Sequence, residues 1–182
     1  MRYSSNHKAE TRSRIIGEAA RRFRKDGIEG TGLVPLMKAL GLTHGGFYAH
    51  FRSKDALVEA SLEAAASQTF ERWPDPDGAS GLRAFVASYL SPEHRDDPGA
   101  GCPLSSLAAE LGLRGTPSAT ADDIVARMGK RLAPATVAAD DDDGLVALAA
   151  MVGALTLARA VQDPARSDRI LQAVQAAIRT PD

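Results

Sequence analysis

Apolar residues recur at helical spacing along most of the chain, and no convincing alternating strand pattern appears. Ile15, Ala19 and Phe23 form one stripe of a first helix, and Gly27 follows it as an end signal. Alanine is abundant and aromatic residues make up only 5% of the chain, which also favours helices over strands. The pattern therefore predicts an all-α protein.

Two short helices follow the first one. Segment 33–40 predicts a helix that tolerates Pro35 only because this residue falls in the first turn. Gly41 closes that helix, since glycine adopts a positive φ without steric cost. Thr43 is a candidate cap for a third short helix that reaches about His50.

The rest of the chain predicts further helices separated by breakers. Ser53 caps the first of them, with Asp55 placed to meet the positive end of its dipole. The four aspartates Asp140–Asp143 precede a long apolar helix for the same reason. The predicted helices are 53–73, a stripe around 82–89, 102–112, a stripe around 124–132, 143–162 and 165–179, with a loop at 91–101. The prediction totals about nine helices in two domains, a helix-turn-helix domain at 1–55 and a helical body at 56–182.

Charge divides the chain in a similar way. The net charge of the 182 residues is −1, but residues 1–60 hold 11 Lys/Arg against 6 Asp/Glu, and the remainder holds 11 against 17. A basic end on an acidic body indicates that the two ends meet different partners. The basic run Arg21, Arg22 and Arg24 is adequately explained as a solvated helix face.

Composition also limits the cellular setting. A single cysteine, Cys102, makes no intramolecular disulfide, and the N-terminal sequence lacks the apolar core of a signal peptide. The longest uncharged run, between Asp143 and Arg159, is short for a membrane span. We therefore expect a cytoplasmic protein without a membrane partner.

The segment 36–58 concentrates candidate chemistry. Two short helices joined at 41–43 form a helix-turn-helix, whose second helix enters the major groove of DNA. Thr43, Tyr48, His50 and Lys54 are hydrogen-bond donors suited to phosphate oxygens. The expected packing set is Leu36, Leu40, Leu42, Phe47 and Phe51.

Two features of this segment bear on base recognition. His44 is the largest polar side chain at the start of the second helix and the best candidate to reach a base edge. Gly45 and Gly46 remove side chains where a helix must approach DNA closely. A metal site is disfavoured, because His44 and His50 fall on different helix faces and no further ligand completes a set.

The chain resembles the TetR/AcrR family of one-component transcriptional regulators. The resemblance rests on "IIGEAARRFRKDGIEGTG" and "LMKALGLTHGGFYAHFRSKDAL", which cover about a quarter of the chain. It implies a homodimer that binds a palindromic operator, usually as a repressor released by a small molecule. It also implies phosphate contacts from Thr43, Tyr48, His50 and Lys54, base-facing positions at His44, Gly45 and Gly46, and a dimer interface formed by the last two helices.

The body offers two candidate sites. Plausible lining residues of an effector pocket are Phe70, Trp73, Tyr89, Met128 and Met151, although each also suits a simple core. Cys102 lies between a loop and a short helix, where a helix N-terminus lowers the pKa of a thiol. An alternative function is therefore a redox- or electrophile-sensing regulator; the competing interpretation is a small buried hydrophobe.

Two further function classes are disfavoured by the sequence. An enzyme with Cys102 as nucleophile lacks a convincing base, since the nearest histidine, His94, falls in the predicted loop. A sequence-indifferent DNA-binding protein is disfavoured by the modest basic excess and the acidic body. We therefore predict a DNA-binding regulator that is not an enzyme and needs no cofactor, while its effector and operator stay open.

Overall fold

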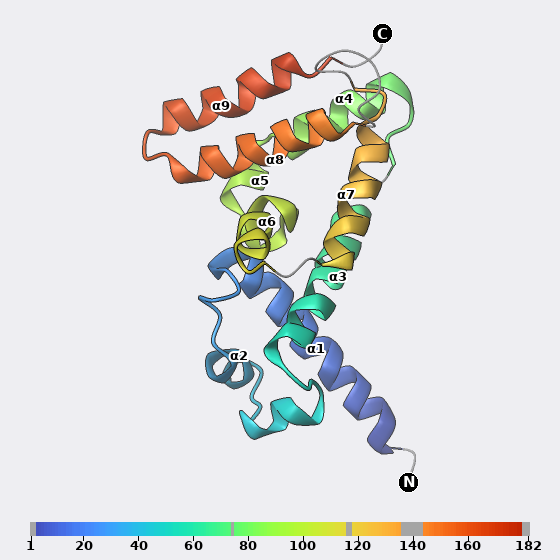
Figure 1. The fold of residues 1–182 in the computed structure, drawn as a ribbon, viewed down its shortest axis with the longest axis vertical. Helices are drawn as coiled ribbons and strands as arrows, with labels where there is room; N and C mark the ends of the chain where they lie inside the picture. Colours follow the sequence, from blue (N-terminus) through green and yellow to red (C-terminus); the bar gives the residue numbers. More distant parts are fainter. Residues whose placement is uncertain (1–2, 74, 116–117, 136–143, 180–182) are drawn as a thin grey trace.

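The computed structural model describes residues 3–73, 75–115, 118–135 and 144–179. These residues form an elongated helical molecule without a sheet, as predicted (Figure 1). The N-terminal helices occupy one end, and α8 and α9 lie at the other (Figure 1). The helices are α1 (Tyr3–Asp26), α2 (Leu33–Ala39), α3 (Lys54–Arg72), α4 (Gly78–Tyr89), α5 (Pro92–Asp96), α6 (Leu104–Leu113), α7 (Ala119–Leu132), α8 (Leu145–Ala160) and α9 (Pro164–Ala177), with 3₁₀ helices η1 (Gly45–Ala49) and η2 (Pro98–Ala100). In the described parts of the chain, no helix combines the length and apolarity needed to cross a membrane.

Helices α1 and α3 form the axis of the molecule. They run side by side from the N-terminal end towards the middle (Figure 1). The predicted stripe of α1 is buried, with Ile15 and Phe23 no more than 1% exposed, and Gly27 ends the helix with φ 79°. Ser53 caps α3 as predicted, because its Oγ accepts a hydrogen bond from the Ala56 N–H at 3.1 Å. The predicted domain division after residue 55 falls in the first turn of α3.

The turn between α2 and η1 follows the expected chemistry. Gly41 has φ 71°, and its N–H donates to the Lys38 carbonyl at 3.0 Å. The Leu42 N–H donates to the Met37 carbonyl at 2.9 Å, which completes a Schellman motif. The predicted third helix is present, but as a 3₁₀ helix. Two consecutive glycines, each unfavourable in an α-helix, open this segment and account for the difference.

The middle of the chain departs from the prediction in two places. The predicted loop 91–101 contains α5 and η2, because Ser91 and Asp97 cap them by accepting the His94 and Ala100 N–H groups. Helix α6 passes through Gly112, the predicted end, and the left-handed residue is Gly115, with φ 64°. The aspartates 140–143, predicted to begin the long apolar helix, lie outside the described residues, as does the predicted breaker at 74.

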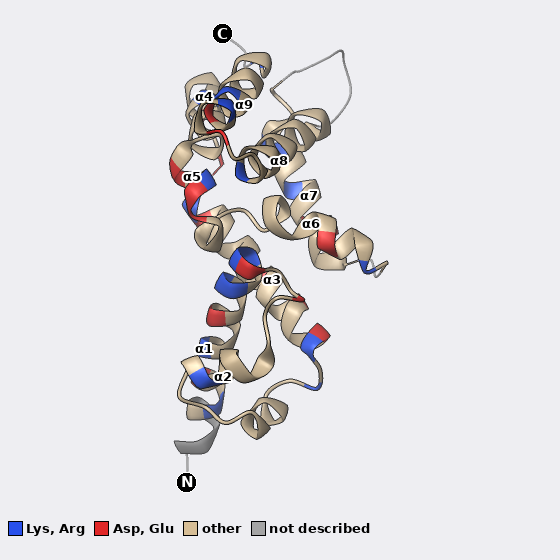
Figure 2. Cartoon of the chain, turned by 90° about the vertical axis from the view of Figure 1, so that its left-hand side faces the viewer, with Lys and Arg blue, Asp and Glu red and all other residues tan. Residues whose placement is uncertain are grey.

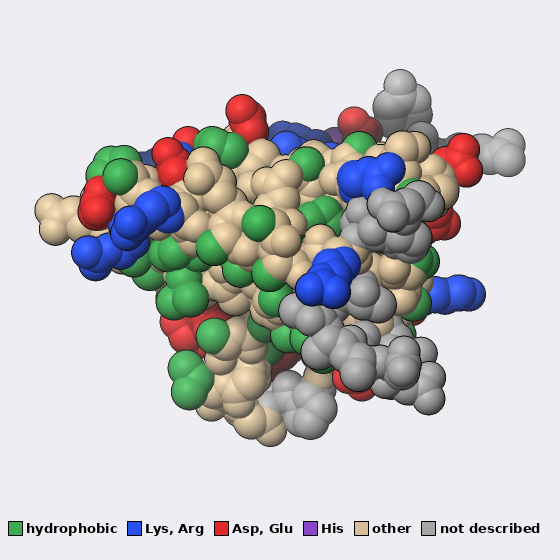
Figure 3. Space-filling view, turned by 90° about the horizontal axis from the view of Figure 1, so that it is seen from above, with side chains coloured by type: hydrophobic (Ala, Val, Ile, Leu, Met, Phe, Trp, Pro, Cys, Tyr) green, Lys and Arg blue, Asp and Glu red, His purple; other side chains and the backbone are tan. Residues whose placement is uncertain are grey.

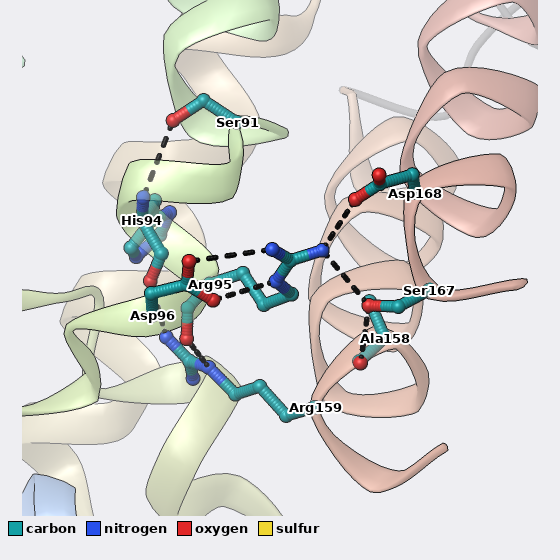
Figure 4. A network of polar contacts seen from close by, with 8 residues as sticks. All are labelled: Ser91, His94, Arg95, Asp96, Ala158, Arg159, Ser167 and Asp168. Atoms are coloured by element: carbon teal, nitrogen blue, oxygen red, sulfur yellow. Dashed lines mark hydrogen bonds and ion pairs between the residues drawn. The ribbon is translucent and has the colours of Figure 1, made fainter. Parts of the chain in front are cut away.

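A polar network joins α5 to α8 and α9 (Figure 4). Arg159 of α8 donates to the carbonyl oxygens of His94 and Arg95, at 2.7 and 3.0 Å. Arg95 in turn donates to Asp168 at 2.5 Å and to the Ser167 hydroxyl at 3.0 Å, both on α9. These contacts satisfy the end of α5 and fix its position against the last two helices.

His94 is the buried centre of this region. Its ring lies 4.7 Å from the rings of both Trp73 and Tyr89, and no part of the residue is exposed. Nδ1 lies 2.7 Å from the Tyr89 carbonyl oxygen, and Nε2 lies 3.0 Å from the Cys102 backbone nitrogen. A neutral imidazole that donates from Nδ1 and accepts at Nε2 satisfies both contacts. Burial lowers the pKa of His94 to about 4.

This burial predicts a pH-dependent stability. In the unfolded chain His94 has a pKa near 6.5, so between pH 6.5 and 4 the unfolded state binds more protons than the folded one. The free energy of unfolding should therefore fall as the pH is lowered through this window, by up to about 3 kcal/mol from this residue. Urea unfolding at pH 7 and pH 5, with NMR titration of the imidazole, measures the effect. An imidazole in the folded protein that titrates near pH 6.5 would contradict it.

Candidate nucleic-acid interface

The helix-turn-helix rests on the predicted apolar frame. Leu36, Phe47 and Phe51 are at most 3% exposed, and the two phenylalanine rings stack with centroids 5.6 Å apart. Leu40 and Leu42 are partly buried against the same core. The predicted packing set is thus confirmed, and it holds η1 against the first helices with its polar residues outward.

The outward face of η1 is exposed. Tyr48 is 61% exposed, with its ring edge-to-face against Phe47 at 5.2 Å and against His44 at 5.8 Å. A Cβ added at Gly45 would meet no atom within 4 Å, so no contact within the protein requires glycine there. Thr43 does cap this turn, since its Oγ accepts from the Gly46 N–H at 3.2 Å. His44, Gly45 and Tyr48 therefore present a surface that a large partner can approach closely.

His50 and Lys54 flank this face. His50 Nδ1 is buried without a hydrogen-bond partner. Burial lowers the pKa of His50, and the positive charges of Lys8 and Arg12 on α1 lower it further. Lys54 is half-buried in the first turn of α3. Sequence reasoning had not singled out Lys8 and Arg12, because only the fold brings α1 next to residue 50.

Basic residues are spread along α1, the helix that links this surface to the body (Figure 2). The prediction that Arg24 lies on a solvated face is wrong, since this residue is only 4% exposed. Its guanidinium donates to the carbonyl oxygens of Ala20 and Gly101 at 3.1 Å and to Gln68 Oε1 at 2.7 Å. Burial lowers the pKa of Arg24, and each of its three nitrogens donates one of these hydrogen bonds.

A carboxylate of the body accepts two hydrogen bonds from the turn after α1. Glu110 on α6 accepts the backbone N–H of Ile28 at 2.8 Å and that of Glu29 at 2.7 Å, one on each oxygen. The turn begins at Gly27, where an added Cβ would lie 3.1 Å from the same carboxylate. Arg114, one turn later, pairs with Asp55 at the start of α3. These contacts tie α6 to the helix-turn-helix domain.

The residues predicted for an effector pocket lie mainly in the core. Tyr89, Met128 and Met151 have no exposed surface, so in this structure they border no space that holds a water molecule. Phe70 is covered by Arg127, whose guanidinium carbon lies 3.6 Å from the ring centroid. Trp73 borders a cavity of about 270 Å³. Their role in binding an effector stays a prediction.

Cys102 is fully buried beside His94. The prediction that its pKa is lowered is wrong: burial raises the pKa of the thiol. His94 accepts from the backbone N–H of Cys102, and its own low pKa keeps the imidazole neutral. The two residues are neighbours, but the thiolate and imidazolium forms of a reactive pair are both disfavoured.

Taken together, an elongated helical body and an exposed helix-turn-helix define a DNA-binding protein of the helix-turn-helix class. Residues 15–61 match the family model described as "Bacterial regulatory proteins, tetR family". The N-terminal domain of the chain therefore belongs to the TetR family of bacterial regulatory proteins.

Individual relatives agree with this assignment. The HTH-type transcriptional regulator TtgR of Pseudomonas putida is 38% identical over 64 residues, which are 35% of this chain and 30% of TtgR. The chain thus matches less than a third of the length of that curated relative. A TetR transcriptional regulator from Chloroflexus aurantiacus J-10-FL has the same fold, with a TM-score of 0.73 and 23% identity over 97% of this chain and 100% of the other. AibR, solved in complex with isovaleryl coenzyme A and operator DNA, superposes with a TM-score of 0.60 and 17% identity over 94% of this chain and 99% of the other.

The two hydrogen bonds accepted by Glu110 predict a measurable contribution to stability. Glu110→Gln keeps the side-chain shape but replaces one accepting oxygen with a donor, so one of the two N–H groups is left without an acceptor. We expect the free energy of unfolding to fall by about 1–3 kcal/mol, measured by urea denaturation. Glu63→Gln, an exposed carboxylate on α3, removes the same charge and serves as the control. Equal stability of the two variants would show that these two hydrogen bonds contribute nothing to the free energy of unfolding.

Proposed function

We propose that the protein is a homodimeric repressor that binds a palindromic operator and leaves it when a small molecule binds the body. The phosphate contacts come from Thr43, Tyr48, His50 and Lys54. The bases are approached by His44, Gly45 and Gly46, the positions that the family resemblance assigns to this role.

The exposed face of η1 carries this proposal. Tyr48 is 61% exposed and packs with the edge of its ring against the buried Phe47. Gly45, on the same face, has room for a side chain within the protein. This face therefore suits close contact with an outside surface. The basic α1 beside it supplies positive charge for a polyanion. Phosphate contacts then set the position of the domain, and base contacts select the sequence.

A dimer is supported by the outer face of α8. Val146 and Leu157 are 41% and 58% exposed, and Ala149 and Gly153 lie between them at helical spacing. Small residues between larger apolar ones allow two helices to approach closely. Seen from above, the end of the molecule that carries α8 and α9 shows scattered hydrophobic side chains among charged and other residues (Figure 3). One short recognition element offers few base contacts, and two half-sites double them.

Release by a small molecule is supported by the contacts that join the two parts. Arg24 and Glu110 both connect α1 or the turn after it to the body. A shift of α6 or of the segment around Gly101 changes the position of α1. It also changes the angle of the reading face, which is the exposed face of η1 with His44, Gly45 and Tyr48. AibR, which was solved with both a small molecule and operator DNA, gives a precedent for the two ligands on this fold.

Fluorescence anisotropy tests the proposal directly. The full-length protein is titrated onto labelled DNA from the flanks of its own gene, with excess random DNA as competitor. The proposal expects binding by two protomers per site and a preference of about 10³-fold or more over random sequence. Binding to every DNA with equal affinity would favour a sequence-indifferent protein instead.

Two substitutions separate the assigned roles. Lys54→Ala should weaken binding to all sequences alike and reduce the log–log salt slope by about 0.9 for each phosphate that Lys54 binds. His44→Ala should change which sequences are preferred, with about 1–3 kcal/mol at stake for a specific base contact. Anisotropy on a panel of operator variants measures both effects. A change in preference with Lys54→Ala would contradict the assumed docking.

His50 predicts a pH dependence. Its pKa is lowered in the free protein, and a DNA phosphate beside the ring would raise it. Binding then takes up a proton, so DNA affinity should increase as the pH falls from about 8 to about 6. His50→Gln should flatten this response. An unchanged slope with His50→Gln would exclude the phosphate contact.

A further inference from the structure

A cavity of about 520 Å³ lies where α1 meets the body. Its walls come from the C-terminal half of α1, the C-terminal half of α3 and the segment that joins α5 to η2. Its charged lining residues are Arg21, Arg24, Lys25, Arg72, Asp96 and Asp97. The volume falls within the usual range of small-molecule sites, about 300–1,000 Å³.

Three of these six charged residues, Arg21, Arg24 and Asp96, are already engaged. Arg24 has its three acceptors, and Arg21 holds Glu18 through two hydrogen bonds at 2.9 and 3.2 Å. Asp96 accepts from Arg95 at 2.7 Å. Two arginines of α1, Arg21 and Arg24, are thus held in place at the cavity wall.

Two cations at the cavity keep donors for a ligand. Arg72 makes one hydrogen bond of 3.3 Å to the Ala100 carbonyl oxygen and lies over Trp73, with 5.0 Å between its guanidinium carbon and the ring centroid. The remaining N–H groups of this guanidinium suit a planar or tetrahedral anion. Lys25, exposed on α1, adds an ammonium group from the opposite side of the junction.

We propose that this cavity binds a small organic anion with a carboxylate or phosphate group and additional hydroxyl groups. Lys25 and Arg72 bind the anionic group, and Asp97, whose Oδ1 accepts only one bond of 3.3 Å from the Ala100 N–H, accepts from a hydroxyl. The cavity lies away from the reading face of η1, so the ligand is not a DNA phosphate.

Binding here links the two parts of the molecule. Lys25 belongs to the helix that carries the DNA-binding domain, whereas Asp97 belongs to the body. An anion that contacts both fixes the angle between them, so anion and DNA affinities change each other by the same factor. This coupling rests on the proposed function; the anion site itself does not.

Isothermal titration calorimetry at constant ionic strength tests the site with citrate and glycerol 3-phosphate as probes. Inorganic phosphate and sulfate distinguish recognition of the whole molecule from that of a simple anion. We expect saturable binding of at least one organic probe at one site per chain, and a loss of roughly tenfold or more in affinity with Lys25→Gln.

Three variants keep the test specific. Arg72→Gln should weaken binding as Lys25→Gln does, whereas Lys130→Gln, a matched charge change on α7, should leave it unchanged. Lys54→Ala should also leave it unchanged, which excludes an anion held on the DNA-binding surface. Absence of saturable binding by all four anions, or binding that neither Lys25→Gln nor Arg72→Gln weakens, would overturn the proposal.

DNA affinity is measured in a separate experiment from anion binding. Anisotropy with and without the bound probe should show a change in DNA affinity that disappears with Lys25→Gln. Anion binding by a protein that fails to bind DNA selectively would refute the proposed function and leave the site standing. Selective DNA binding without any anion binding would refute the site alone.

Discussion

The structure depends on α1 packing against both the helix-turn-helix and the body. Its first half packs under the helix-turn-helix, and its last turns are fixed by the body through the buried guanidinium of Arg24. A buried arginine is tolerated only where its donors are satisfied, so Ala20, Gly101 and Gln68 must keep their places for α1 to keep its own. The orientation of the exposed face of η1 therefore follows from contacts made at the opposite end of the helix.

The local features of the DNA-binding end were predictable because they depend on neighbours in sequence. A left-handed Gly41, the cap at Ser53 and the aromatic frame of Phe47 and Phe51 each follow from residue type and spacing. The 3₁₀ form of η1 was missed, although the paired glycines were the available signal. In a short, glycine-rich segment the choice between an α-helix and a 3₁₀ helix depends on tertiary packing. The spacing of apolar residues alone does not decide it.

The contacts that join the two parts were not predictable in the same way. Glu110 reaches Ile28 across 82 positions, and Arg24 reaches Gly101 across 77. On the sequence, Arg24 is one arginine in a basic run, and burial alone distinguishes it from its neighbours. Likewise, Cys102 and His94 are eight residues apart with a turn between them, and only the fold places an imidazole nitrogen on the Cys102 backbone N–H. Long-range polar contacts of this kind leave no periodic pattern.

We propose that the exposed face of η1 reads a DNA sequence as one of a symmetric pair. Selection of binding sites by the full-length protein from a random double-stranded DNA library tests it most directly. A symmetric pair should enrich two inverted half-sites at a fixed spacing, about one helical turn or a multiple of it. Retention of DNA without any enriched sequence would contradict it.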